Sequence, residues 1–105
     1  MTRFRLLVAG GPDYFDDARV RAVLGRILAD KGALTLVETT QRYGAEAAVH
    51  AWAFENGIGS DGFHKLDAAL ASKPDGAVVF SLAYHPCRFA EVIKAAGVPV
   101  FEVGR

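Results

Sequence analysis

The segment "LLVAGGPDYFDD" (residues 6–17) is the most informative about the architecture of this chain. Its apolar start belongs to the run "FRLLVAG" (4–10), which has no helical gaps and therefore predicts a buried strand. The run ends at Gly10-Gly11-Pro12, and the acidic residues that follow are typical of a helix start. Many nucleotide-binding folds begin with such a strand, a Gly-Gly turn and a helix. The stretch therefore predicts this architecture and raises the question of whether the turn binds a phosphate.

Helical patterns alternate with strand patterns along the rest of the chain. The segment 17–32 is expected to be a helix that Asp16 or Asp17 caps and Gly32 ends. Its apolar residues follow helical spacing: Val20, Val23, Leu24, Ile27 and Leu28. Further helices are expected at 44–57, 64–73 and 86–97, the last with Pro86 in its first turn.

The remaining strands are expected at 33–39, 75–82 and 98–103, where apolar runs lie between turn residues. The stretch "IGSDGF" (58–63) contains two glycines and an aspartate and predicts a poor strand, so a sheet of four to five strands is expected. The helix 44–57 is expected to place Ala45, Ala48 and Trp52 on its inner stripe. Trp52 is therefore interpreted as a packing residue.

This alternation predicts an α/β fold: a single Rossmann-like domain over residues 1–105, with three α/β/α layers and a mainly parallel sheet. In such sheets, ligands bind beyond the carboxyl ends of the strands, where the strand order reverses. The loops 10–16, 38–46 and 81–87 are therefore the candidate ligand-binding segments.

The composition of the chain argues against some classes of partner. Twelve basic residues balance twelve acidic ones, so net charge gives no support to nucleic-acid binding. No stretch approaches the roughly 18 apolar residues that a membrane span needs, and the lone Cys87 forms no internal disulfide. We expect a small soluble cytoplasmic domain without a membrane partner. Its apolar composition and aromatic loop residues further predict a homo-oligomer, with a dimer as the commonest case.

Four segments carry a resemblance to a known family. They are "RLLVAGGPDYFD", "TLVETTQRYGAEAAVHAWAFENGI", "PDGAVVFS" and "FAEVIKAAGVPVFEV". Together they resemble the YspA-like branch of the SLOG superfamily, whose Rossmann-like members include the LOG phosphoribohydrolases. The resemblance covers most of the chain and is closer in the scaffold segments than in the ligand loops. It implies a nucleotide or nucleotide-derived ligand.

The first two ligand loops match the family pattern in part. Pro12 stands where the family has arginine, which removes a guanidinium suited to phosphate. The threonines at 39 and 40 replace glycines of the second loop, and Tyr43 has to be treated as an insertion. The third loop lacks the family's glycines and runs from Ser81 to Cys87. The ligand-binding residues that the resemblance and the loop positions imply are Gly10, Gly11, Asp13, Thr39, Thr40, Arg42, Gly44 and Ser81.

Catalytic candidates are few. A glutamate follows the third loop in LOG enzymes and is important for cleaving the N-glycosidic bond, and Glu91 is the candidate for that place here. Glu46, at a second-loop position where the family usually has aspartate, is the other candidate. His85 and Cys87 lie together near an expected helix start, where a thiol is activated, but a packing cysteine is the simpler interpretation. They lack the spaced partners of a zinc site. We expect no metal and no cofactor.

Three function classes stay open. The first is a sensor-like domain that binds a small nucleotide-like ligand at the carboxyl ends of the strands. The second is an enzyme that hydrolyses a nucleotide N-glycosidic bond. The third is a ligand-free interaction scaffold, which a dimer burying Tyr43 or Tyr84 would favour. The first is the preferred interpretation, because the Gly10-Gly11 turn lies where a phosphate would bind.

Overall fold

The computed structural model describes residues 3–10, 16–39, 45–80 and 89–103. Within these ranges, the strands are β1 (Phe4–Gly10), β2 (Leu34–Thr39), β3 (Ser60–Phe63), β4 (Gly76–Phe80) and β5 (Val100–Val103). The helices of the same part of the chain are α1 (Asp17–Lys31), α2 (Ala45–Glu55), α3 (Leu66–Ala71) and α4 (Phe89–Ala95). The predicted alternation of strands and helices is confirmed. The expected position of Pro86 in the last helix lies outside the described residues.

The strands form one sheet in the order β3-β2-β1-β4-β5, and every pair in it is parallel. The prediction that 58–63 makes a poor strand is wrong, because Ser60–Phe63 pairs with β2 from Leu36↔Ser60 to Thr39↔Phe63. An edge strand is held by backbone hydrogen bonds to one neighbour, so it does not need the apolar side chains of a central strand. The sheet therefore has five strands, at the upper end of the expectation.

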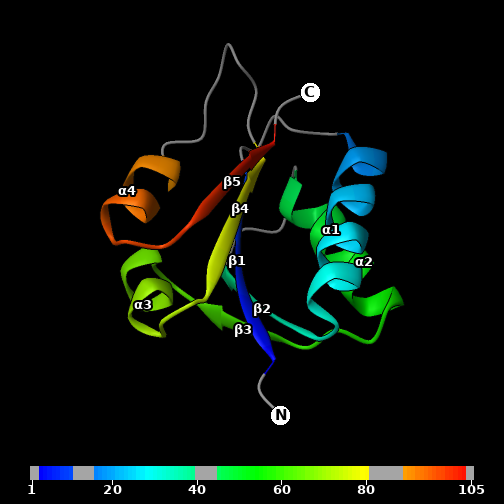
Figure 1. Ribbon diagram of the computed structural model, residues 1–105, viewed down its shortest axis with the longest axis horizontal. Coiled ribbons are helices and arrows are strands. Elements are labelled where there is room, and N and C mark those ends of the chain that lie inside the picture. The colour runs from blue at the N-terminus through cyan, green and yellow to red at the C-terminus, as the bar shows by residue number, and fades with distance from the viewer. Residues whose placement is uncertain (1–2, 11–15, 40–44, 81–88, 104–105) are drawn as a thin grey trace.

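Helices cover both faces of the sheet, as Figure 1 shows: α1 and α2 lie on one side and α3 and α4 on the other. Successive residues of the strands pack alternately into two separate hydrophobic cores, one on each face of the sheet. Leu6, Val8 and Leu36 pack beneath α1 and α2, whereas Leu7, Val37 and Val79 pack with residues of α3 and α4. The expected three-layer α/β/α arrangement is thereby confirmed.

The helix α1 begins and ends as predicted. The carboxylate of Asp16 accepts a hydrogen bond from the backbone N–H of Arg19 at 3.1 Å and caps the helix. Gly32 ends it with φ of 83°, a left-handed conformation that favours glycine, and its N–H donates to the carbonyl of Leu28. Val20 and Leu24 of the predicted stripe are fully buried.

The helix α2 packs through Val49, Trp52 and Ala53, all of them buried. The packing role of Trp52 is confirmed, and Ala48 lies partly buried beside it. The expected stripe missed Val49 and Ala53, which continue the same helical spacing. The side chain of Ala45 lies outside the described part of the structure.

Polar contacts of Arg5 join three elements near the amino-terminal ends of the strands. Its guanidinium donates to Oδ2 of Asp61 on β3 at 2.8 Å and to Oγ of Ser72, the residue after α3, at 3.0 Å. Its backbone N–H donates to Oδ2 of Asp75, just before β4, at 2.9 Å. These contacts are at the end of the sheet opposite to the predicted ligand site, so we assign them a structural role.

Candidate functional site

The carboxyl ends of the strands form the edge at which the sequence predicts the ligand. The chain runs outward from β1 through β2 to β3, then crosses to β4 and continues outward to β5. The strand order therefore reverses between β1 and β4, where Gly10 lies beside Phe80. Crevices at such reversal points are the usual ligand sites of parallel sheets.

The predicted ligand-binding residues divide into two groups. Gly10 and Thr39 are the last residues of β1 and β2, and both are buried. The other six lie outside the described residues: Gly11, Asp13, Thr40, Arg42, Gly44 and Ser81. His85 and Cys87 also lie outside them.

The two catalytic candidates lie on different helices. Glu46 belongs to the first turn of α2, and its side chain is not among those described. Glu91 lies in the first turn of α4, on the other face of the sheet, and its side chain is exposed. The two candidates therefore belong to helices on opposite faces of the sheet.

Glu38 is a feature of this edge that the sequence analysis missed. It is the penultimate residue of β2, its side chain is only 8% exposed, and its Oε2 lies 3.3 Å from Nδ1 of His50 on α2. Glutamate is rarely buried without a partner, because removing a carboxylate from water costs several kcal/mol. A buried carboxylate at this position is therefore a candidate binding group for a hydroxyl, an amine or a developing positive charge.

The strand pattern contains a signal for Glu38. Leu34 and Leu36 point toward α1 and α2, and a period of two places Glu38 on the same covered face. A charged residue that continues a buried stripe is informative because it has to be paired. His50 lies twelve residues further along the chain, so its contact with Glu38 depends on the placement of α2.

Thr39 lies on the opposite face of β2, in line with Val37, and is 6% exposed. It is paired in register with Phe63 of β3. Glu38 and Thr39 thus bring a carboxylate and a hydroxyl to the two faces of the same strand end. Together with Gly10, they form the described part of the candidate site, which we call the carboxyl-edge site.

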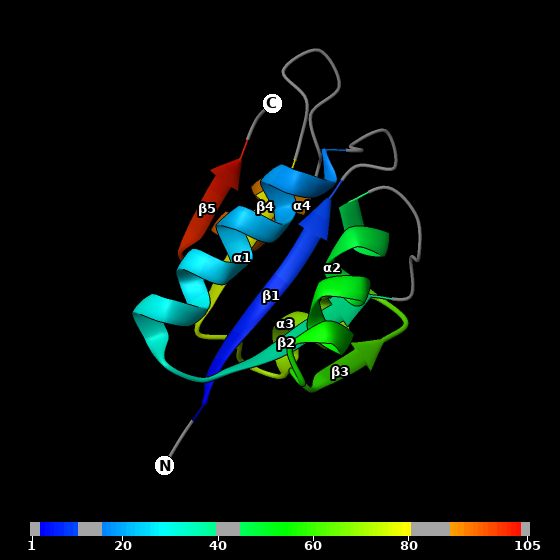
Figure 2. The same cartoon turned by 90° about the vertical axis from the view of Figure 1, so that its right-hand side faces the viewer.

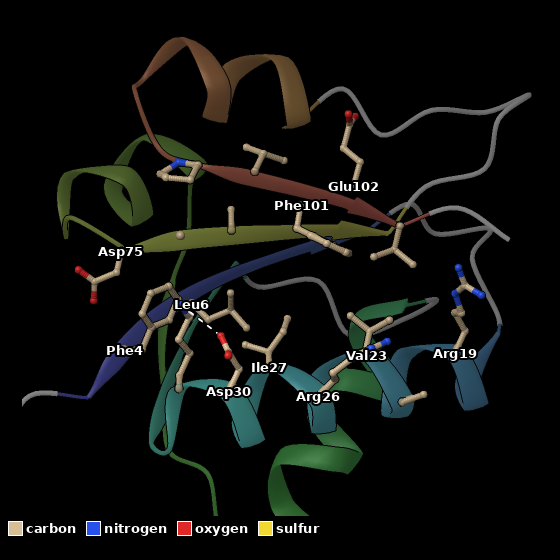
Figure 3. Close-up of a pocket in the computed structure, with 17 residues that line it drawn as sticks. Phe4, Leu6, Arg19, Val23, Arg26, Ile27, Asp30, Asp75, Phe101 and Glu102 are labelled. Atoms are coloured by element: carbon tan, nitrogen blue, oxygen red, sulfur yellow. Dashed lines mark ion pairs between the residues drawn. The ribbon is translucent and has the colours of Figure 1, made fainter.

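A second feature is a groove of about 990 Å³ between α1 and β5, drawn in Figure 3. Arg19, Val23 and Ile27 line its α1 side, and Phe101 of β5 points into it. The groove extends along the sheet from Val103 to Phe4, at the amino-terminal end of β1. It is therefore a separate surface feature and not the crevice between β1 and β4.

Among residues 3–10, 16–39, 45–80 and 89–103, no three His, Cys, Asp or Glu side chains are grouped so that they would hold a metal ion. None of the described helices has the length and apolarity to cross a membrane.

The parallel sheet, its two helical layers and its reversal point define the class of Rossmann-like α/β proteins. The family model YAcAr, described as the YspA, cpYpsA-related SLOG family, matches residues 4–65. The chain belongs to this family. The matched region extends from β1 to the residues after β3 and includes Gly10, Glu38 and Thr39. No significant match was found among curated proteins or among solved structures.

Proposed function

We propose that this protein binds a small nucleotide or nucleotide-derived ligand at the carboxyl-edge site. The observation that carries the proposal is that two polar residues, Glu38 and Thr39, are buried at the end of β2. Both lie within the region that the SLOG family model matches. Family membership supports a nucleotide-related role, and the reversal of strand order supports this location.

The proposed roles follow from the chemistry of each residue. Gly10 has no side chain, so the backbone at the end of β1 leaves room for a ligand. Glu38 accepts hydrogen bonds from ligand hydroxyl or amino groups, and His50 holds its carboxylate in place. Arg42, three residues after the end of β2 in the sequence, provides the charge that an anionic phosphate requires.

The first experiment is native mass spectrometry of the purified protein, followed by denaturing release of any bound molecule. A nucleotide-like mass supports the proposal. Thermal unfolding with a panel of mono- and dinucleotides provides the second readout, because a ligand at 100 times its Kd stabilises the folded state by about 2.7 kcal/mol.

Glu38→Gln is the decisive variant, and Glu55→Gln at the exposed end of α2 is its matched control. We expect the first to reduce the ligand-induced shift in melting temperature and the second to leave it unchanged. A protein that carries no ligand and does not respond to the nucleotide panel would contradict the proposal and favour the interaction-scaffold interpretation.

A hydrolase is the second candidate function, and the buried carboxylate of Glu38 favours it. In this reaction, the bond between C1′ of the sugar and the base nitrogen breaks, water adds its oxygen to C1′, and the base leaves with a proton. A carboxylate would stabilise the positive charge that develops at C1′. Chromatographic detection of released base tests this activity, and Glu38→Gln, Glu46→Gln and Glu91→Gln would identify the carboxylate responsible.

A further inference from the structure

The strand β5 is the last strand on one side of the described sheet. Among the described strands it pairs with β4 alone, and Figure 2 shows it beyond α1 at the border of the molecule. An uncovered edge strand presents unpaired backbone groups that can bind another strand.

The hydrogen bonds to β4 settle the direction of the β5 backbone groups. The N–H of Ala77 donates to the carbonyl of Pro99 at 2.9 Å, so the backbone groups of residue 99 face β4. Along a strand, successive residues point these groups to opposite sides. Residues 101 and 103 therefore also face β4, whereas Val100 and Glu102 present their N–H and C=O outward. Proline has no backbone N–H, but the N–H of residue 99 would face β4. Its absence therefore removes no donor from the outer side of β5.

The side chains of β5 differ between its two faces. Phe101 is 62% exposed and points into the groove beside α1, next to Val78 of β4. Glu102 points to the other face, where its Oε2 accepts a hydrogen bond from Nζ of Lys94 on α4 at 2.9 Å. The open edge thus combines outward backbone donors and acceptors with one large exposed aromatic residue.

The other edge of the sheet has a different character. The residues of β3 include Ser60, Asp61 and Gly62, all exposed, and Asp61 is held by Arg5. Polar and charged residues on an edge strand discourage pairing with further strands. On β5, the charge of Glu102 is paired with Lys94 on the α4 face, whereas the other face exposes Phe101.

We propose that a second copy of this chain pairs with β5 through its own β5, in antiparallel orientation about a two-fold axis at Phe101. In this register, Val100 of each copy lies opposite Glu102 of the other, and these outward-facing residues exchange four backbone hydrogen bonds. Phe101 lies opposite Phe101 of the second copy, so the exposed ring of each chain is covered by the other. The two sheets become one continuous ten-stranded sheet.

Self-complementarity selects a second copy as the occupant. A two-fold axis perpendicular to the sheet joins each face of one copy to the same face of the other. The two Phe101 side chains therefore meet on the face that α1 covers. Shifting the axis to Glu102 would place two carboxylates directly opposite each other, which is unfavourable. The balanced charge of the chain, twelve basic and twelve acidic residues, also creates no net repulsion between copies.

A cross-linking experiment tests the register. In the full chain with Cys87→Ser, Phe101→Cys places a cysteine at the non-hydrogen-bonded pair, where Cα atoms are about 4.5 Å apart and a disulfide forms readily. Glu102→Cys is the control on the same strand. In the proposed register, residue 102 lies opposite residue 100 of the second copy, so the two introduced cysteines are two residues apart along the strands. We expect the 101–101 disulfide at least tenfold faster than the 102–102 disulfide. Equal rates would overturn the register.

The oligomeric state in solution tests the surface itself. We expect the unmodified chain to form a dimer by analytical ultracentrifugation, and Phe101→Asp to weaken its association at least tenfold. Circular dichroism confirms that this variant is folded, and Phe54→Asp, at the exposed Phe54 of α2, is the matched control that leaves the dimer intact. A monomer at all soluble concentrations, or a dimer that Phe101→Asp does not weaken, would overturn the proposal.

Discussion

Nδ1 of His50 lies 3.3 Å from Oε2 of Glu38, so a half-exposed imidazole on α2 pairs with a carboxylate buried at the carboxyl end of β2. The separation is that of an ion pair, and an ionised carboxylate favours a proton on the ring nitrogen that faces it. The contact therefore selects the form of the imidazole that carries its proton on Nδ1. The same contact fixes the carboxylate beside the proposed ligand site.

The first prediction concerns this imidazole. In long-range ¹H–¹⁵N spectra, neutral His50 should have its proton on Nδ1, because Glu38 accepts it. Glu38→Leu removes the acceptor, so the proton population should move toward Nε2. The exposed His64 provides an internal control that should not change between the two proteins. A His50 that is protonated on Nε2 when Glu38 is present would contradict the pairing.

The scaffold could be predicted from sequence because its signals are local. The apolar run 4–10, the helical stripe of Val20 and Leu24, and the stop at Gly32 each depend on neighbouring residues only. The pattern at 58–63 was misleading for a physical reason. Ser60 and Asp61 lie on an edge, where backbone pairing with β2 forms a strand without an apolar face.

The Glu38–His50 contact and the exposure of Phe101 could not be predicted in the same way. The first joins two elements whose separation is set by how α2 packs on the sheet. The second depends on which faces the helices leave uncovered: "VPVFEV" has the composition of a buried strand, yet Phe101 is 62% exposed. Both features follow from tertiary packing, which local periodicity does not specify.

The second prediction tests the core beneath α1. Leu24 is fully buried against the sheet, so Leu24→Ala should lower the free energy of unfolding by about 2–5 kcal/mol. Val92→Ala is the control, since Val92 lies on α4 and is 45% exposed. Its effect should stay within roughly 0.5 kcal/mol. Urea denaturation measures both, and similar losses for the two variants would contradict the assigned core.

The third prediction concerns Gly76 at the start of β4. A Cβ at this position would lie 3.0 Å from Cζ of Phe4, closer than ordinary van der Waals contact. Gly76→Ala should therefore force the Phe4 ring to shift, and it should lower the free energy of unfolding relative to a glycine-to-alanine change at an uncrowded position. Phe4→Leu removes the ring, so the same glycine substitution should cost less in that background.

The matched control for this third prediction is Gly62→Ala on β3. A Cβ there meets nothing within 4 Å, so the substitution should leave stability unchanged or increase it slightly. Chemical denaturation of Gly76→Ala, Phe4→Leu and the double variant measures the coupling free energy between Gly76 and Phe4. Equal costs of Gly76→Ala with and without the Phe4 ring would show that this contact does not cause the effect.

The last prediction concerns the ion pair that holds β5 against α4. The hydrogen bond from Lys94 to Glu102 raises the pKa of the Lys94 ammonium above its usual 10.5. A group whose pKa is raised in the folded state stabilises the fold fully below its unfolded pKa, and the stabilisation is lost as the pH rises through the folded pKa. Lys94→Met removes this titration. The unmodified protein should therefore melt at a slightly higher temperature than Lys94→Met between pH 7 and pH 9, and the difference should disappear once the pH exceeds the raised pKa of the Lys94 ammonium.

Both partners of this pair are about half exposed, so salt should also reduce the difference. Glu102→Gln should behave like Lys94→Met, and the double variant should lose no more than either single variant. Because Glu102 is drawn toward α4, this pair also favours the orientation in which Phe101 points toward α1. A difference in melting temperature that is the same at pH 7 and at a pH where the Lys94 ammonium has lost its proton would mean that this charge does not stabilise β5.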